Sequence, residues 1–256
     1  MFIKDLLKDK VILVTGGRSG IGYQIARSCL LYGAVVYITS RKEEKLKAAA
    51  KKLKELGPCY AIAGDIRAVE QVQNVAEHIK ALSGRLDILV NNAGGQFPAP
   101  AQDISPNGWN AVINNNLNGT WYMTQIMAKE FFIPQQSGSI INIIANMFRG
   151  FPGMVHTGAA RAGVDNITKT LAVEWSRFNI RINAIAPGII QSTGLEQYPP
   201  ELLKDVSDRI PLKRLGTTKE VADLAVFLMS PMANFITGET IYIDGGQRLW
   251  GDVFEF

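Results

Sequence analysis

The sequence contains few of the residues that mark a disulfide-bonded or metal-binding protein. Its 256 residues include 2 cysteines, Cys29 and Cys59, whose spacing does not match that of a metal site. Two such cysteines favour buried free thiols in a reducing compartment over a disulfide framework. We therefore expect no bound metal ion.

Long hydrophobic runs are also missing. No apolar stretch reaches membrane-spanning length, and the charged segment Met1–Lys10 leads directly into a short apolar run without the features of a signal peptide. We therefore expect a cytoplasmic protein with no membrane partner.

The sequence lacks a strong excess of positive or negative charge. The chain has 27 Lys and Arg residues against 23 Asp and Glu residues, which gives a net charge of +4. Lysines gather over residues 41–54, but glutamates are mixed with them, and this mixture is typical of a solvated helix face. We expect no nucleic-acid partner, although the weak positive balance favours an anionic cofactor or substrate.

Short β-branched runs alternate with longer amphipathic segments along the chain, and no repeat, linker or low-complexity segment interrupts them. The 47% of hydrophobic residues is ample for one large core, so we expect a single domain over residues 1–256. The alternation predicts an α/β fold, a doubly wound parallel sheet of about seven strands with helices on both faces. The expected strands lie at 11–15, 34–39, 59–63, 86–91, 139–144, 180–185 and 239–243.

One insertion departs from this alternation, at about residues 189–214. It carries Pro199, Pro200 and Pro211 around a short polar segment. A ligand crevice is expected at the carboxyl ends of the strands, and a long loop beside it is typical of a substrate lid. The alternative is a plain surface excursion.

The first expected strand stops at a group of glycines, and residues at helical spacing follow from Tyr23. Glycines let the backbone approach a pyrophosphate, whose charge is stabilised by the free N–H groups and the dipole of the helix. An ordinary strand-to-helix connection is the alternative interpretation. The segment reads Thr15-Gly16-Gly17-Arg18-Ser19-Gly20-Ile21-Gly22.

This spacing, Gly-x-x-x-Gly-x-Gly after a threonine, resembles the short-chain dehydrogenase/reductase family, whose fold is of the Rossmann type. Further matching segments run from about residue 9 to 247, so the resemblance covers nearly the whole chain. They are Asp65, Asn91-Asn92-Ala93-Gly94, Asn116 within 115–120, the stretch 179–188, and Asp244-Gly245-Gly246.

The resemblance implies which residues would hold a dinucleotide. The glycine-rich turn would hold the pyrophosphate, the residues after the third strand the adenine, those after the fourth a ribose, and those after the sixth the nicotinamide. Asn91 and Asn92 have an alternative role, which is to tie neighbouring strands together. The implied residues are Gly16, Arg18, Ser19, Gly20, Ile21, Gly22, Asp65, Ile66, Asn92, Ala93, Gly94, Pro187, Gly188 and Ile190.

The end of the second strand bears on the choice of cofactor. The sequence Thr39-Ser40-Arg41-Lys42 contains no acid that would accept hydrogen bonds from an adenosine ribose. Arg41, Lys42 and Arg18 suit a 2′-phosphate instead, so we expect NADP(H) rather than NAD(H). Alternatively, Arg41 only lies at an exposed helix start.

The reactive centre departs from the family pattern. The carbonyl reductases of the family use Tyr-x-x-x-Lys on the helix after the fifth strand, with a serine at the end of that strand. Here Thr157 stands for the tyrosine, Arg161 for the lysine and Ala145 for the serine. Asn116 alone is retained, and Arg161 still suits the nicotinamide ribose.

These replacements disfavour ordinary ketone reduction, because a threonine hydroxyl is too weak an acid to protonate an alkoxide. They suit reduction of a carbon–carbon double bond conjugated to a thioester, in which an oxygen needs stabilisation. We expect Asn116 and Thr157 to polarise the thioester carbonyl, with Arg161 holding the ribose. His156 is a candidate proton source, or it faces solvent.

Three further strings, 91–97, 155–164 and 171–175, are similar to the trans-2-enoyl-CoA and 2,4-dienoyl-CoA reductase branch of the family. This implies an NADPH-dependent enzyme, an acyl-thioester substrate and a homotetramer. Dienoyl reductases supply a tyrosine from the loop after the fifth strand. Residues 146–151 contain none, which favours the enoyl reaction over the dienoyl reaction.

Apolar residues near this loop are candidates for an acyl-chain channel, although core packing is their alternative role. Two other functions stay open for the chain. One is a carbonyl reductase or alcohol dehydrogenase of the same family, and the other is a catalytically silent NADP-binding regulator. The channel candidates are Phe97, Met147, Phe148, Phe151, Met154 and Val155.

Overall fold

Seven strands build one parallel sheet in the computed structural model, which describes residues 5–195, 198 and 203–249. Their order is β3-β2-β1-β4-β5-β6-β9, and all seven were predicted, with boundaries displaced by a few residues at most. They are β1 Val11–Thr15, β2 Val35–Ser40, β3 Cys59–Ala63, β4 Ile88–Asn91, β5 Gly138–Ile143, β6 Ile180–Pro187 and β9 Thr240–Ile243.

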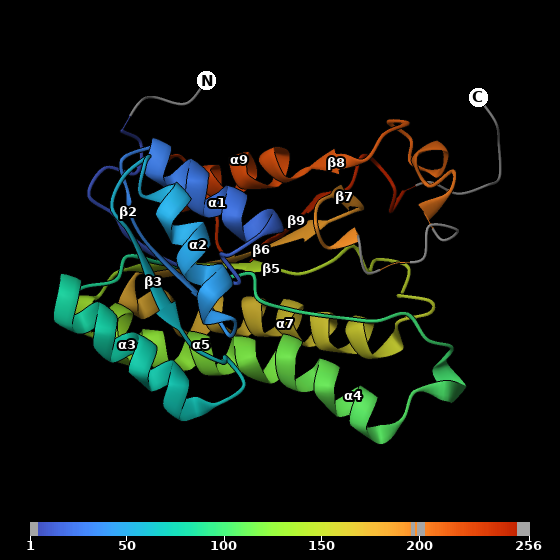
Figure 1. Ribbon diagram of the computed structural model, residues 1–256, viewed down its shortest axis with the longest axis horizontal. Coiled ribbons are helices and arrows are strands. Elements are labelled where there is room, and N and C mark those ends of the chain that lie inside the picture. The colour runs from blue at the N-terminus through green and yellow to red at the C-terminus, as the bar shows by residue number, and fades with distance from the viewer. Residues whose placement is uncertain (1–4, 196–197, 199–202, 250–256) are drawn as a thin grey trace.

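Helices cover both faces of this sheet (Figure 1). One layer holds α1 Gly20–Leu31, α2 Glu43–Leu53 and α9 Thr218–Met229. The other layer holds α3 Val69–Ser83, α4 Pro106–Ile113, α5 Gly119–Met127 and α7 Val155–Glu174. The connection after β1 leads to β2 on one side, whereas the connection after β4 leads to β5 on the other, so the strand order reverses between β1 and β4. This reversal opens a crevice at the carboxyl end of these strands.

Shorter elements complete the second layer and the connections. A π-helical turn over Asn114–Asn118 joins α4 to α5, and a second over Ala128–Phe132 joins α5 to α6 Ile133–Gln135. Single 3₁₀ turns lie at Ala101–Asp103, Ser176–Phe178, Ser207–Arg209 and Pro231–Ala233.

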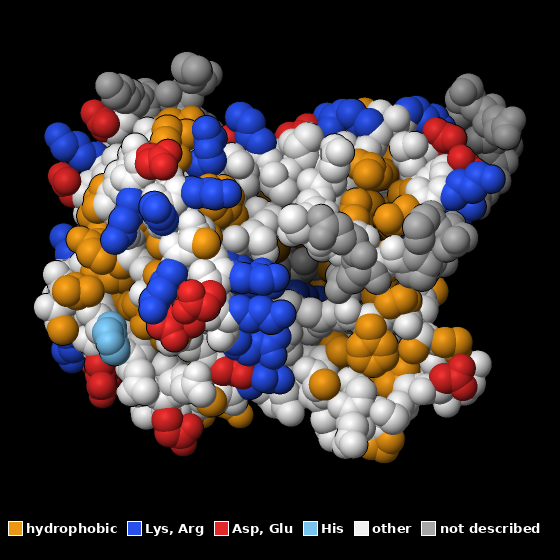
Figure 2. All heavy atoms as spheres, viewed as in Figure 1, with side chains coloured by type: hydrophobic (Ala, Val, Ile, Leu, Met, Phe, Trp, Pro, Cys, Tyr) orange, Lys and Arg blue, Asp and Glu red, His pale blue; other side chains and the backbone are white. Residues whose placement is uncertain are grey.

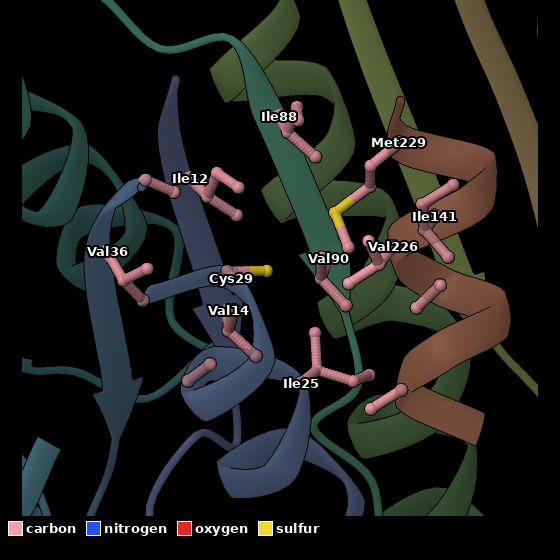
Figure 3. Close-up of a cluster of buried hydrophobic side chains, with 14 of the residues drawn as sticks. Ile12, Val14, Ile25, Cys29, Val36, Ile88, Val90, Ile141, Val226 and Met229 are labelled. Carbon is pink, nitrogen blue, oxygen red and sulfur yellow. The ribbon is translucent and has the colours of Figure 1, made fainter. Parts of the chain in front are cut away.

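The core consists of two apolar layers separated by the sheet. Successive side chains of β1 point to opposite faces, and all of them are buried, so both faces require a cover of helices. Ile12 and Val14 pack with Cys29 of α1 and Val226 of α9 on one face, as Figure 3 shows. Leu13 packs into the opposite layer.

Both cysteines are free and buried, as the sequence predicted. Burial raises the pKa of the Cys29 thiol to about 12 and that of Cys59 to about 11, because the charged thiolate is poorly solvated there. They act as small apolar core residues.

The predicted lid insertion begins and ends at a small two-stranded sheet. Strand β7 Ile190–Gln191 pairs in parallel with β8 Gly216–Thr217, near the carboxyl ends of the main strands (Figure 1). Thr217 then caps α9 in a reciprocal hydrogen-bond pair with Glu220. Arg214 and Thr217 lower the pKa of Glu220 to about 2. Residues 196–197 and 199–202 of the insertion lie outside the described part of the chain.

Over the described ranges, no helix combines the length and apolarity needed to cross a membrane. Nor do the same residues bring together three or more His, Cys, Asp or Glu side chains in a metal-binding group.

Candidate active site

The β1–α1 turn has the backbone geometry that its glycines suggest. Gly16 has φ +67° and Gly20 has φ +57°, a left-handed conformation that a side chain would strain. Gly22 is needed for a different reason, because a Cβ there would collide with the side-chain amide of Asn92. The turn therefore depends on glycine for conformation at two positions and for packing at a third.

The carboxyl ends of β1 and β4 are tied together by Thr15 and Asn92. The Thr15 Oγ1 accepts hydrogen bonds of 2.9 Å from the backbone N–H groups of Asn92 and Ala93. The Asn92 amide donates to the Thr15 carbonyl at 2.9 Å, and Asn91 donates to Asn142 on β5 at the same distance. The strand-tying role considered for Asn91 and Asn92 is thus confirmed.

A cavity of about 340 Å³ lies over these strand ends. The first turn of α1 faces it without an acidic residue or a side-chain cap, so its N–H groups are available to an anion. The buried Thr39 Oγ1, Ser40 Oγ and Arg161 Nε on its walls have no hydrogen-bond partner. A nucleotide with several hydroxyl and phosphate oxygens fits these unfilled donors.

Most of the predicted cofactor residues line this cavity. Gly22 lies behind the wall, and Pro187, Gly188 and Ile190 line a second, neighbouring cavity instead. The predicted residues that line the first cavity are Gly16, Arg18, Ser19, Gly20, Ile21, Arg41, Lys42, Asp65, Ile66, Asn92, Ala93, Gly94 and Arg161.

The wall at the end of β2 is positively charged. Arg18, Arg41 and Lys42 line the cavity there, and Figure 2 shows Lys and Arg side chains gathered on the rim of a hollow in the middle of this face. The one acid of the described lining, Asp65, is held by Arg67 in a two-pronged pair, with Nη2–Oδ2 at 2.6 Å. This pairing lowers the pKa of Asp65 and offsets its negative charge.

Arg161 on α7 is 8% exposed and donates from Nη1 to the carbonyl of Ile143 at 3.0 Å. No described acid forms an ion pair with it, and burial lowers its pKa to about 10, so it stays charged at neutral pH. A buried cation without a partner is costly unless a ligand supplies acceptors. Its place on the cavity wall fits the predicted role in holding a ribose.

Asn116 does not face either cavity. It lies fully buried on the π-helical turn, and its amide donates to the carbonyls of Gly95 at 2.7 Å and Val112 at 2.9 Å. Its Oδ1 accepts from the Gly95 N–H at 3.3 Å. The side chain therefore secures the loop at Gly94 and Gly95, and the predicted contact with a thioester carbonyl gains no support from this geometry.

Thr157 and His156 are also fully buried and line neither cavity. His156 accepts the Thr157 N–H on Nδ1 at 2.8 Å, and its ring meets the edge of Phe97 with centroids 4.6 Å apart. Both lie in the first turn of α7, which packs into the protein. The roles in polarising or protonating a substrate stay predictions, and the alternative that His156 faces solvent is wrong, because its side chain is buried.

The second cavity, of about 910 Å³, adjoins the first and shares part of its wall with it. Ala145, at the family's serine position, lines it, as do Phe151 and Met154 of the predicted channel. The other channel candidates do not, and Phe148 is 62% exposed. No charged side chain occurs among its described lining residues. The residues common to both cavities are Ile21, Gln96, Ile144, Ser192 and Gly194.

The structure adds one residue that the sequence analysis missed. Tyr198, in the insertion predicted to be a lid, lines the large cavity, and its hydroxyl is hydrogen-bonded to Gln96 Nε2 and lies 3.8 Å from the Met154 sulfur. The family resemblance points to a tyrosine in the loop after β5 or on α7, and Tyr198 lies outside both segments. The prediction of a lid at residues 189–214 was the signal that could have drawn attention to Tyr198, since a lid residue would lie near the substrate.

A family model described as Enoyl-(acyl carrier protein) reductase matches residues 16–248. The chain belongs to the short-chain dehydrogenase/reductase family. It is therefore an oxidoreductase of a family that uses a nicotinamide cofactor, as its motifs predicted.

Individual relatives differ in the activity that their names state. A probable 2,4-dienoyl-CoA reductase of Bacillus subtilis is 40% identical over 249 residues, which cover 95% of this chain and 98% of the relative. A glucose 1-dehydrogenase of Gluconobacter oxydans is 38% identical, covering 97% of this chain and 96% of the relative. The solved structure of a citronellol catabolism dehydrogenase from Pseudomonas aeruginosa superposes on this one with a TM-score of 0.87. The two sequences are 39% identical, and the match covers 97% of this chain and 98% of that chain.

Proposed function

We propose that this protein uses NADPH to reduce a carbon–carbon double bond of an unsaturated acyl-CoA thioester. The observation that carries the proposal is the large cavity without charged lining residues in the described chain, which opens beside the nucleotide cavity. An apolar space of about 910 Å³ suits an acyl chain, whereas a sugar needs many polar partners. Similarity to a dienoyl-CoA reductase supports the same substrate class.

The positive wall after β2 supports NADPH over NADH. Arg18, Arg41 and Lys42 line that wall, and Arg67 already offsets the carboxylate of Asp65. A 2′-phosphate placed there gains charge-assisted hydrogen bonds of about 1.5–3 kcal/mol each. The ribose of NADH would leave these cations without an anionic partner.

The bound cofactor supplies the hydride, and the chain's own residues position the reaction. Arg161 holds ribose hydroxyls, since its Nε is buried without a partner on the cavity wall. Asn116 fixes Gly95, which lines the nucleotide cavity, and so keeps this part of the cavity wall in one position. Apolar residues such as Phe151 and Met154 exclude water around the acyl chain.

The preference for an enoyl over a dienoyl substrate loses its basis. It depended on the absence of a tyrosine from the loop at residues 146–151, and Tyr198 from the insertion lines the large cavity instead. We therefore propose the broader class of 2-enoyl and 2,4-dienoyl thioesters. The same phenol favours a second candidate, a carbonyl reductase, since a phenol also protonates an alkoxide.

Substrate assays separate these candidates. Purified protein is mixed with NADPH and crotonyl-CoA, a longer 2-enoyl-CoA, 2,4-hexadienoyl-CoA or a 3-ketoacyl thioester, and loss of NADPH absorbance is followed. Glucose is tested in the opposite direction, with NADP+ as the oxidant, by the gain of NADPH absorbance. We expect turnover with unsaturated thioesters. Turnover confined to ketones or sugars would reject the proposal, and tight NADPH binding without any turnover would favour the silent regulator. The cytoplasmic location and the homotetramer stay predictions, and light scattering checks the latter.

A further inference from the structure

We propose that Tyr198 is the proton donor of this enzyme, so that a phenol from the lid replaces the one missing from α7. The inference rests on the proposed function and assigns to it a residue that no motif in the chain marks. Its basis is the place of Tyr198 on the wall of the large cavity, next to Gln96, which lines both cavities, and the direction of its hydrogen bonds.

Tyr198 lies next to the junction of the cavities. Its hydrogen-bond partner, Gln96, lines both of them, and Ile144 and Ser192 border the same junction. With a nucleotide in the smaller cavity and an acyl chain in the larger, the reacting carbons meet at this junction. A donor bonded to Gln96 is therefore one side chain away from the double bond.

The hydrogen bonds leave the phenolic proton available. Gln96 donates from Nε2 to the phenol oxygen, so the O–H group of Tyr198 is free to donate elsewhere. It points to the sulfur of Met154 at 3.8 Å. A thioether is a weak acceptor, and a negatively charged substrate atom entering the cavity would displace it readily.

Other acids are poorly placed for this task. Tyr198 is the one titratable side chain among the described residues that line the large cavity. His156 is enclosed behind Phe97, and Asp65 is bound to Arg67 in the nucleotide cavity. Thr157 is buried against His156 with its hydroxyl 3.4 Å from Nδ1. The geometry thus leaves one phenol in reach of the substrate.

The proton balance is as follows. Hydride from the reduced nicotinamide adds to the electron-poor carbon of the alkene, and its electron pair moves to give an enolate of the thioester. The O–H bond of Tyr198 then breaks, its proton bonds to the carbanionic carbon, and the phenol oxygen keeps the electron pair. Solvent water then returns a proton to the phenolate.

Tyr198→Phe tests the assignment, because it keeps the ring and removes the hydroxyl. We expect kcat with an unsaturated acyl-CoA to fall on the order of 100-fold, while KM and the NADPH dissociation constant change by less than about threefold. Tyr60→Phe, on the edge strand β3, is the matched control and should keep the wild-type rate.

The outcomes are distinguishable. If wild-type protein turns over unsaturated thioesters and Tyr198→Phe keeps its kcat within about twofold, the inference fails and the proposed function stands. A loss that appears in KM with kcat intact also overturns the inference, because it indicates packing of the lid. Wild-type protein without activity on any unsaturated thioester overturns both.

Discussion

The two cavities of this protein are built in different ways. The nucleotide cavity is formed largely by short turns that follow β1, β2, β3 and β4, so its walls come from residues adjacent to strands. The large cavity is closed by segments distant in the chain, and the contact between Gln96 and Tyr198 spans 102 positions. Local sequence rules therefore apply well to the first cavity and poorly to the second.

Replacing Arg161 is expected to have the largest effect, and it tests whether the nucleotide cavity holds the cofactor through this buried side chain. Arg161→Met keeps length but removes the charge-assisted hydrogen bonds of a buried cation. We expect the dissociation constant for NADPH to rise roughly 10- to 100-fold. Isothermal titration calorimetry measures this constant. Arg161→Lys, which restores the family's residue, should lose less NADPH affinity than Arg161→Met.

The same variant should not weaken the fold. Arg161 is buried with no ion-pair partner among the described residues, so its replacement by an apolar side chain removes a desolvated charge. A large drop in unfolding free energy together with unchanged NADPH affinity would contradict the ligand-holding role.

Arg41 tests the charge of the nucleotide cavity. Arg41→Asp places a carboxylate where a 2′-phosphate is proposed to lie, and we expect NADPH to bind about 10- to 100-fold more weakly while NADH binding is retained. Fluorescence titration with each cofactor measures the change. Lys51→Asp on the exposed side of α2 makes the same change in net charge and is the control. An equal loss of NADPH affinity in both variants would mean that Arg41 acts only through long-range attraction between the protein and the cofactor.

Replacing Asn116 tests whether its hydrogen bonds to the backbone of Gly95 stabilise the loop at that residue. Asn116→Ala leaves the N–H and C=O of Gly95 without their side-chain partner, and we expect the free energy of unfolding to fall by about 1–3 kcal/mol. Denaturant titration measures it. Asn114→Ala, on the exposed side of the same π-helical turn, is the control, and a loss of turnover with unchanged stability would favour direct contact with the substrate.

Thr157 has the smallest expected effect and marks the sharpest difference from the sequence-based prediction. Thr157→Val is nearly isosteric and removes a hydroxyl that lines neither cavity. We expect kcat to stay within about twofold of wild type. Steady-state kinetics measures this. A fall in kcat comparable with that of Tyr198→Phe would indicate that Thr157 contacts the substrate.

Most of the predicted cofactor residues line one cavity, whereas Asn116 and Thr157 line none, and this difference has a physical origin. Glycines such as Gly16 and Gly20 require particular backbone angles, and those angles are visible in the residue type itself. For Asn116 and Thr157, the residue type does not reveal whether the side chain faces a ligand or the protein interior. Asn116 turned out to bind backbone, and Thr157 to pack beside His156.

The sequence by itself determined the seven strands, the helices on both faces and the glycine turn that faces a nucleotide. These follow from hydrophobic period and backbone preference, which act between near neighbours along the chain. Tertiary structure alone decided that Arg67 pairs with Asp65 at the cavity wall, that Asn116 donates to the backbone of Gly95 and Val112, and that Tyr198 meets Gln96. Such contacts depend on how packed elements orient their side chains, and no local pattern fixes that orientation.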